Sequence, residues 1–389
     1  MRAMTDSPGG LVLAFPRSRL AGALRLWPAL AAWAAGAAGI LPAAAADGYP
    51  PLRADTWTKW DSYLYLDVAR HGYTLFHCAP PHAQHWCGNA GWFPLYPALT
   101  AVVHVAGVPL AGGALMLAWA FGLGTLALVA IALGDALFTF GGAAALAFAA
   151  FVPGGVFGYA VYPLSLLSFA LLAHMLLLAK GRWWAAGLAA GIAAAAYPVG
   201  IAAVPVAIAW LVLVGRETPV RERLRRAAIV GGLGVAGAAT TAVVQAIQVG
   251  RWDAYFLVQD KYGHSLRDPL TPVVNAARAL RGWTPLNVVY APALQTLLVA
   301  LVLGLVLVEL VVRRATATRL DVLVALWLVA AWLAVHSEAG ISIYRSQETI
   351  LPAALLVRRL PRPLAALVLG AAVWVTVDMA RLFVEGRLV

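Results

Sequence analysis

The chain has 389 residues, of which 62% are hydrophobic and 12% are charged, and its mean hydropathy is +0.81. Apolar runs of about 20 residues recur along its whole length, as bilayer-crossing helices require, so the composition excludes an ordinary water-soluble domain. The net charge of +11 comes mostly from arginines clustered between the apolar runs. This placement is typical of a membrane orientation signal, and it lacks the interleaved basic and aromatic residues of a nucleic-acid partner surface.

The first apolar run, from about 26 to 46, follows Arg2, Arg17, Arg19 and Arg25. Because positive charge stays on the cytoplasmic side, we expect a cytoplasmic N-terminus and an outward crossing. The alanine-rich end of this run also resembles a signal-peptidase site, so a cleaved signal peptide is the alternative. We favour a retained helix because the later spans give the chain no need of a removable signal.

The stretch from 47 to 111 is predicted to be a long first extracytoplasmic loop with interfacial helices. Its part from 57 to 97 is polar and rich in aromatic residues, and carboxylates lie beside tryptophan and tyrosine. This combination suits sugar chemistry, since aromatic rings stack on the apolar faces of pyranoses and carboxylates take protons from hydroxyls. An ordinary interfacial loop, with Trp and Tyr at headgroup level, is the alternative.

The apolar piece from 93 to 107 is broken by Pro94 and Pro97 and could be a short span or an interfacial helix. If it stays outside, every later basic loop falls on the cytoplasmic side and the C-terminus falls outside, so we prefer this topology. It predicts an all-α polytopic membrane protein, one integral-membrane domain over 1–389 with about 11 transmembrane helices. After 26–46, the expected spans are 112–133, 139–157, 162–179, 183–196, 199–215, 227–248, 290–312, 321–337, 346–357 and 363–381. The basic loops are Lys180/Arg182, 216–226, 313–319 and 358–362.

Several expected helices, notably 183–196 and 346–357, are shorter than a bilayer needs, so some must be re-entrant or packed within the bundle. The topology also gathers five polar segments on the outer face. They are the first loop, the turns at 162–165 and 197–198, a second extracytoplasmic loop over 249–290, and the segment 342–347. We therefore expect a cavity at the outer membrane surface.

A two-part motif in the first loop resembles a known family. The order Trp60-Asp61, Tyr65-Leu66, Ala69, Gly72-Tyr73 and then Phe93-Pro94-Leu95-Tyr96-Pro97 is similar to the opening of the PIG-V mannosyltransferases, and it covers about a tenth of the chain. These relatives of the second mannosyltransferase of GPI-anchor synthesis belong to the GT-C membrane glycosyltransferases. The resemblance implies a GT-C-like bundle, a polyprenyl-phosphate sugar donor and a catalytic acid in the first extracytoplasmic loop.

Two positions depart from the family pattern. Family members tend to read Tyr-Ser-Glu-Ser-Leu where this chain has Leu164 in place of the carboxylate, and they tend to carry an arginine where this chain has Tyr197. If those groups contact donor or acceptor, this protein uses a different substrate or has lost activity.

An inverting transfer from a polyprenyl-phosphate sugar needs a base for the acceptor hydroxyl and cations for the leaving phosphate. We expect Asp61 to be the base, with an N-cap or a solvated acid as its alternative role. Asp67 is a possible second carboxylate, but on a helix it would fall on a different face. For the phosphate we expect Arg345, near a helix N-terminus, with Lys261 and Arg267 as alternatives; each could instead be an interfacial anchor. The candidate substrate-binding rings are Trp60, Tyr65, Tyr73, Tyr162 and Tyr197.

The cysteines, Cys78 and Cys87, enclose eight residues in an oxidising location, so we expect a loop disulfide. His77, His82 and His85 crowd the same segment, which leaves a zinc site as the alternative. Neither reading implies metal-dependent catalysis, and no cofactor is expected, because the lipid-linked sugar is a substrate.

The sequence therefore predicts a membrane glycosyltransferase that moves a sugar, with mannose favoured, from a polyprenyl-phosphate donor to an extracytoplasmic lipid or glycan acceptor. Its other expected partners are membrane lipids, and no nucleic acid. The alternative is a degenerate GT-C scaffold that binds or transports lipid without catalysis. Transport would predict ionisable groups near the middle of spans, and the sequence shows few.

Overall fold

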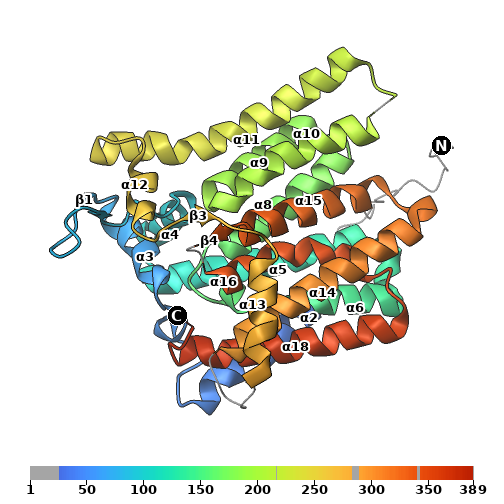
Figure 1. Ribbon diagram of the computed structural model, residues 1–389, viewed down its shortest axis with the longest axis horizontal. Helices are drawn as coiled ribbons and strands as arrows, with labels where there is room; N and C mark the ends of the chain where they lie inside the picture. Colours follow the sequence, from blue (N-terminus) through green and yellow to red (C-terminus); the bar gives the residue numbers. More distant parts are fainter. Residues whose placement is uncertain (1–25, 216, 283–288, 340–341, 389) are drawn as a thin grey trace.

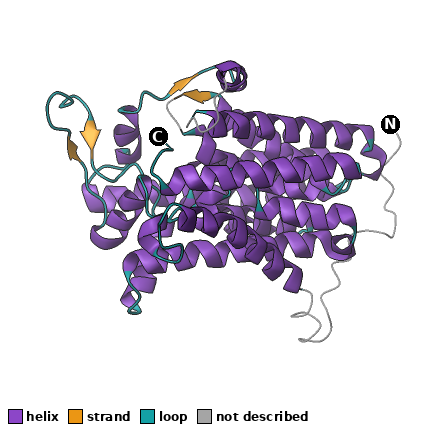
Figure 2. Cartoon of the chain, turned by 90° about the horizontal axis from the view of Figure 1, so that it is seen from below, coloured by secondary structure: helices purple, strands orange, loops and turns teal. Residues whose placement is uncertain are grey.

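The computed structural model describes residues 26–215, 217–282, 289–339 and 342–388, and 76% of the chain is helical. Four arginines that we used for orientation, Arg2, Arg17, Arg19 and Arg25, lie outside the described residues. The same is true of Arg216 and of part of the second loop. Figures 1 and 2 show long helices that run side by side through the molecule. This agrees with the predicted all-α membrane class.

Six helices in the described part of the chain are long and apolar enough to cross a membrane, whereas we expected about 11 spans. Each coincides with an expected apolar run, so hydropathy located these elements well. They are α2 Trp27–Ala46, α5 Leu110–Leu133 with its extension η2 Gly134–Phe138, α11 Val220–Val249, α14 Tyr290–Val312, α15 Arg319–His336 and α18 Arg362–Val384.

Four of the remaining expected spans are shorter apolar helices, and so is the piece from 93 to 107 that we expected to stay outside. At about 1.5 Å per residue, an 11-residue helix covers only about 17 Å, roughly half of a bilayer core. The expected span 139–157 ends early at Ala150, because Pro153 follows and cannot continue the helix. These helices are α4 Leu95–Val105, α6 Phe140–Ala150, α8 Leu164–Ala179, α9 Trp183–Ala196, and α10 Ala203–Val214 after the 3₁₀ turn η3 Pro198–Ala202.

Small residues allow α9 and α11 to pack closely, as their glycine and alanine content predicts. A Cβ atom added to Gly237 would lie 2.1 Å from the carbonyl oxygen of Gly191, so no larger residue fits there without moving a helix. Helix α8 packs between α5 and α9. The buried core is therefore continuous across the bundle.

The expected short helix 346–357 is a buried chain of short turns instead of one helix. It consists of α16 Ile343–Ser346, the 3₁₀ segment η6 Gln347–Ala353 and α17 Ala354–Val357, and residues 346–357 are all buried. Pro352 removes a backbone donor inside this segment, which disfavours a regular α-helix. This agrees with the expectation that the segment packs within the bundle.

The remaining elements are short and lie in the connections. Four of them are two-residue strands that form two antiparallel pairs, β1 with β2 and β3 with β4. They are η1 Ala54–Trp57, α3 Asp61–His71, β1 Phe76–His77, β2 Trp86–Cys87, α7 Val156–Tyr159, α12 Ala254–Asp260, β3 Ser265–Leu266, α13 Thr271–Ala279, η4 Leu280–Gly282, η5 Arg314–Thr316 and β4 Glu338–Ala339.

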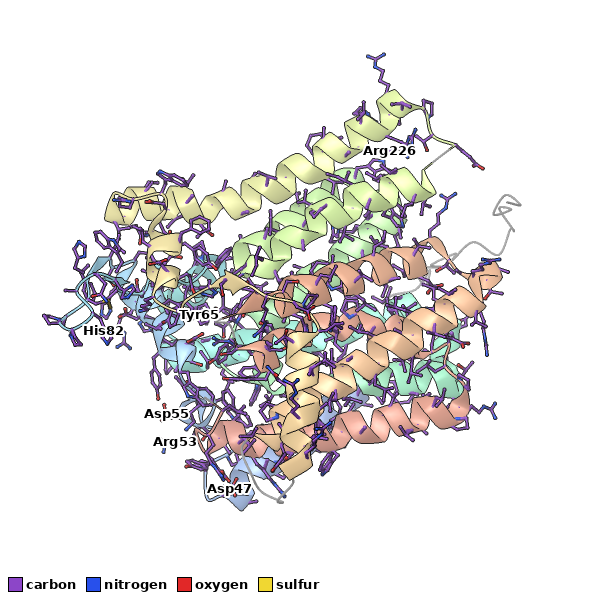
Figure 3. The ribbon with its side chains drawn as sticks, viewed as in Figure 1. Asp47, Arg53, Asp55, Tyr65, His82 and Arg226 are labelled. Carbon is purple, nitrogen blue, oxygen red and sulfur yellow. A yellow bond between two sulfur atoms is a disulfide. The ribbon has the colours of Figure 1, made fainter. Side chains whose placement is uncertain are left out.

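The first loop and the arginine-rich connections lie at opposite ends of the bundle. In Figure 3, Asp47, Asp55 and His82 lie at the end that also contains Tyr65, whereas Arg226 lies at the other end. This separation is the one that the predicted topology requires.

Candidate active site

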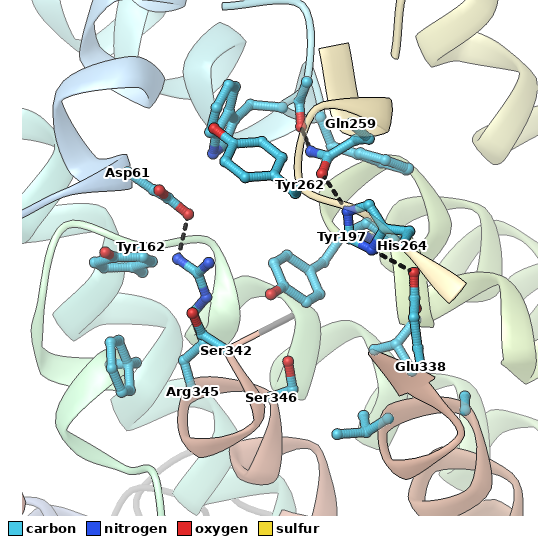
Figure 4. Close-up of a pocket in the computed structure, with 18 of the residues that line it drawn as sticks. Asp61, Tyr162, Tyr197, Gln259, Tyr262, His264, Glu338, Ser342, Arg345 and Ser346 are labelled. Carbon is cyan, nitrogen blue, oxygen red and sulfur yellow. Dashed lines mark hydrogen bonds and ion pairs between the residues drawn. The ribbon is translucent and has the colours of Figure 1, made fainter. Parts of the chain in front are cut away.

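A cavity of about 460 Å³ opens at the end of the bundle that carries the first loop. Its lining comes from all five polar segments that the sequence places on one face, so their convergence is confirmed. Residues 91–93 also contribute, so both parts of the two-part motif reach the cavity. Trp60 and Tyr65 line the cavity. Figure 4 shows the lining residues Asp61, Tyr162, Tyr197, Gln259, Tyr262, His264, Glu338 and Arg345.

Asp61 begins helix α3 and faces the cavity. Trp60 precedes it as the N-cap residue with φ +45°, the one non-glycine residue with positive φ in the described part of the chain. Such a conformation costs energy, and ring contact between Trp60 and Phe383, with centroids 5.3 Å apart, helps to hold it. Asp61 is therefore not the N-cap, and its charge in the first turn is favoured by the helix dipole.

Arg345 reaches Asp61 from α16, and the two side chains form an ion pair between Nη1 and Oδ2 (Figure 4). The residues are 284 positions apart in the chain. Their side chains are 22% and 23% exposed, so both are largely buried but remain reachable from the cavity. The pair combines an acceptor of protons with a cation able to bind phosphate.

Three predicted tyrosines, Tyr65, Tyr162 and Tyr197, surround this pair. Burial is the main cause that raises the pKa of each phenol, and Asp61 raises it further while Arg345 opposes the rise. The rings therefore stay neutral at physiological pH and offer hydroxyl groups and aromatic faces. Tyr162 donates a hydrogen bond to the Lys59 carbonyl (3.1 Å), which fixes its ring beside the pair.

Gln259, His264 and Glu338 form a polar wall that the sequence reasoning missed. His264 Nε2 lies 2.9 Å from Gln259 Oε1, and the Gln259 amide donates to the Gly91 carbonyl at 2.7 Å. On its other side, His264 Nδ1 lies 2.8 Å from Glu338 Oε1. The pairing of β3 with β4 brings these segments together. The sequence signal that points to this wall is the run of polar residues from 259 to 267 in the second loop, from which we predicted only the cations Lys261 and Arg267.

Two candidates from the first loop, Asp67 and Tyr73, lie outside the cavity lining. Asp67 accepts a hydrogen bond from Asn89 Nδ2 (2.6 Å) and contacts His71 Nδ1 (2.8 Å). Tyr73 is buried and donates its hydroxyl proton to the Trp92 carbonyl (2.7 Å). Both residues hold the loop in shape, because the helical turn of α3 directs Asp67 away from Asp61.

The alternative phosphate ligands, Lys261 and Arg267, are also absent from the cavity lining in the described part of the chain. Lys261 lies over the Tyr262 ring, 5.0 Å from its centroid. Arg267 donates from Nε to the His336 carbonyl (3.1 Å) and so fixes the second loop to the end of α15. Of the three predicted cations, Arg345 alone lines the cavity.

The two cysteines form a disulfide, as predicted, with Cα atoms 5.0 Å apart. The bond closes the hairpin of β1 and β2, in which Phe76 pairs with Cys87. Among the described residues, no group of three or more His, Cys, Asp or Glu side chains has the arrangement of a metal site.

Leu164, the position where the PIG-V pattern tends to have a carboxylate, is buried at the start of α8 and does not line the cavity. A different carboxylate, Glu348, lies inside the bundle beside an internal cavity of about 30 Å³. The Oε1 atom of Glu348 lies so close to Gly158 that a Cβ atom added there would be 2.9 Å from it. The Oε2 atom of Glu348 has no hydrogen-bond partner among the described residues. The sequence reasoning did not single out this residue.

Comparison with protein-family models and with curated proteins found no match to this chain. The resemblance of the first loop to the PIG-V family therefore remains a prediction from the motif.

Proposed function

We propose that this protein is a GT-C-type membrane glycosyltransferase that moves a sugar, with mannose favoured, from a polyprenyl-phosphate donor to an extracytoplasmic lipid or glycan acceptor. In this proposal Asp61 is the general base and Arg345 binds the donor phosphate. The PIG-V-like motif supplies the reaction class, the donor and the side of the membrane.

The main support is the contact between Asp61 and Arg345. The sequence nominated one as a base and the other as a phosphate ligand for separate reasons, and they meet in one cavity. The pair is largely withdrawn from solvent, with side chains 22% and 23% exposed, which distinguishes it from the exposed surface ion pairs that contribute little stability.

In the proposed reaction, the acceptor oxygen forms a bond to C1 of the donor sugar while the bond from C1 to the phosphate oxygen breaks. Asp61 takes the acceptor proton, and polyprenyl phosphate leaves with the bonding electron pair. Arg345 stabilises the negative charge that grows on this leaving group. The contact in the structure uses one oxygen of Asp61 and one Nη of Arg345, so each group retains a second atom that can meet substrate.

The aromatic lining suits a sugar more than a free phosphate. Trp60, Tyr65, Tyr162 and Tyr197 offer ring faces and neutral hydroxyl groups around the ion pair. The cavity of about 460 Å³ falls within the range of about 300–1,000 Å³ that is usual for small-molecule sites.

One observation favours the alternative of a lipid-binding or transport protein. Glu348 is a buried carboxylate inside the bundle, and such groups often belong to proton or ion pathways. Under this alternative, Glu348→Gln would abolish lipid movement across vesicles while Asp61→Asn would leave it unchanged.

The decisive experiment measures sugar transfer from synthetic polyprenyl-phosphate donors by purified wild type, Asp61→Asn and Asp67→Asn. Asn preserves size but cannot take the proton, so Asp61→Asn should lower transfer by about 100- to 10,000-fold per folded molecule. Asp67 lies on the same helix outside the cavity, so Asp67→Asn is the matched control and should keep its turnover. Inert wild type with every donor, or normal transfer by Asp61→Asn, would contradict the proposal.

A further inference from the structure

A second cavity, of about 510 Å³, lies at the other end of the bundle from the Asp61 site. It is a groove where α18 begins, where α14 ends and where η2 leads into α6. Four arginines line it, namely Arg313, Arg358, Arg359 and Arg362, and the described lining contains no carboxylate. In Figure 1 the start of α18 lies at the right-hand end of the molecule and the C-terminus at the left.

Arg358 and Arg359 are fixed in place and are not interfacial anchors with loose side chains. Their side chains are only 15% and 12% exposed, and each donates to a different oxygen of Asp321, at 2.8 and 2.9 Å. Asp321 is wholly buried behind the groove, where it also caps α15 through Thr318. The two guanidinium groups are therefore held ready for an anion before any ligand arrives.

The groove carries more positive charge than its neighbours neutralise. Its four arginines face two carboxylates, because Asp321 serves the pair and Glu309 pairs with Arg313. Arg359 Nε is buried without a hydrogen-bond partner among the described residues. Burial lowers the pKa of Arg358, and the neighbouring positive charge of Arg359 lowers it further. The Asp321 carboxylate raises this pKa but only partly offsets the two effects. An anion in the groove would relieve this imbalance.

Two further features favour a lipid over a soluble anion. The groove lies where the candidate membrane span α14 ends and α18 begins, and the ends of membrane spans are where lipid headgroups are met. Phe140 lines the groove, and its side chain is 47% exposed, so an apolar surface lies beside the arginines. A soluble phosphate buries none of the apolar surface of that ring, whereas a lipid acyl chain would cover it.

We propose that this groove is a binding site for the headgroup of an anionic phospholipid, with the phosphate on Arg358, Arg359 and Arg362 and the upper acyl chain against Phe140. The site is separate from the Asp61 cavity and does not depend on the proposed reaction. A basic pocket between membrane helices is a recurrent recognition site for acidic lipid headgroups.

The test measures lipid retention by the full-length protein in neutral detergent, using native mass spectrometry with phosphatidylglycerol, cardiolipin and phosphatidylcholine. The test variant is Arg362→Glu, an exposed position at the start of α18 where lost charge leaves no buried partner. The control is Arg221→Glu, which makes the same charge change at an exposed position in the first turn of α11, outside the groove. Thermal unfolding with inorganic phosphate provides the soluble-anion arm.

We expect the wild type to retain phosphatidylglycerol and cardiolipin and to release phosphatidylcholine. Each near-membrane charge contributes about fivefold to such binding, so Arg362→Glu should weaken it by about 25-fold and Arg221→Glu by much less. Phe140→Ala should weaken lipid retention without changing any effect of inorganic phosphate. Equal losses in the two charge variants, equal retention of phosphatidylcholine, or binding of inorganic phosphate as strong as that of lipid would overturn the proposal.

Discussion

Replacing Arg345 separates a phosphate-binding role from a structural one. We expect Arg345→Ala to raise the donor KM and lower kcat/KM, with Arg345→Lys in between, because a guanidinium can meet a phosphate with two hydrogen bonds and an ammonium acts as a point charge. A hydrogen bond to a charged group contributes about 1.5–3 kcal/mol, so the alanine variant should lose about 10- to 150-fold. Arg345 is only 22% exposed, so solvent screening should reduce this range little.

The same substitution also has a predicted effect on stability. Removing Arg345 leaves Asp61 without its ion-pair partner in a tyrosine-lined cavity, but the carboxylate keeps some solvent contact and the favourable field of α3. We expect a loss of about 1–3 kcal/mol, measured by thermal unfolding followed through tryptophan fluorescence. Transfer assays normalised to folded protein then separate the two effects.

The matched control is Arg53→Ala, which breaks an Arg53–Asp55 pair near the same end of the bundle (Figure 3). Because this arginine is 68% exposed and lies outside the cavity, neither stability nor donor use should change appreciably. Donor use equal to wild type in both Arg345 variants would refute the phosphate-binding role. A loss of stability alone, with unchanged kcat/KM per folded molecule, would make Arg345 a structural residue.

Three further predictions concern the scaffold. Replacing both cysteines by serine should destabilise the β1–β2 loop by about 2–3 kcal/mol in the chain-entropy model. We expect faster proteolysis of this loop, and an unchanged cleavage rate would contradict the prediction. Gly237→Val should prevent the close packing of α9 on α11 and lower the free energy of unfolding by about 1–3 kcal/mol or more. Gly232→Val, at an open position of α11, is the control and should be tolerated, so equal melting temperatures of the two variants would contradict the prediction. A cysteine at the exposed Leu52 should react with an impermeant maleimide from the extracytoplasmic side of intact cells, and labelling from the cytoplasmic side alone would reverse the topology.

Local sequence determined the helical segments and the disulfide, because these depend on interactions within one stretch of chain. Partition of a segment into lipid is governed by its own apolar residues, so the long helices α5, α11 and α14 lie where hydropathy predicts them. Closure of the Cys78–Cys87 loop is local for the same reason. The motif around Asp61 likewise carried enough information to nominate a base.

Hydropathy could not count the spans, because it measures the transfer of a segment out of water and does not separate lipid from protein interior. Residues 346–357 are buried by their neighbours and are broken by Pro352 into short turns. The helix α6 ends at Ala150 for a similar local reason, although its apolar pattern continues.

Tertiary structure decided which side chains of the five predicted polar segments contact one another. The helical period already separates Asp61 from Asp67, as the sequence predicts, but only the folded chain shows that Asp67 accepts a hydrogen bond from Asn89. Arg345 meets Asp61 across 284 residues, and the pairing of β3 with β4 brings His264 to Glu338. These contacts depend on how small residues let the helices pack, a collective property of the bundle that no single stretch of the sequence contains.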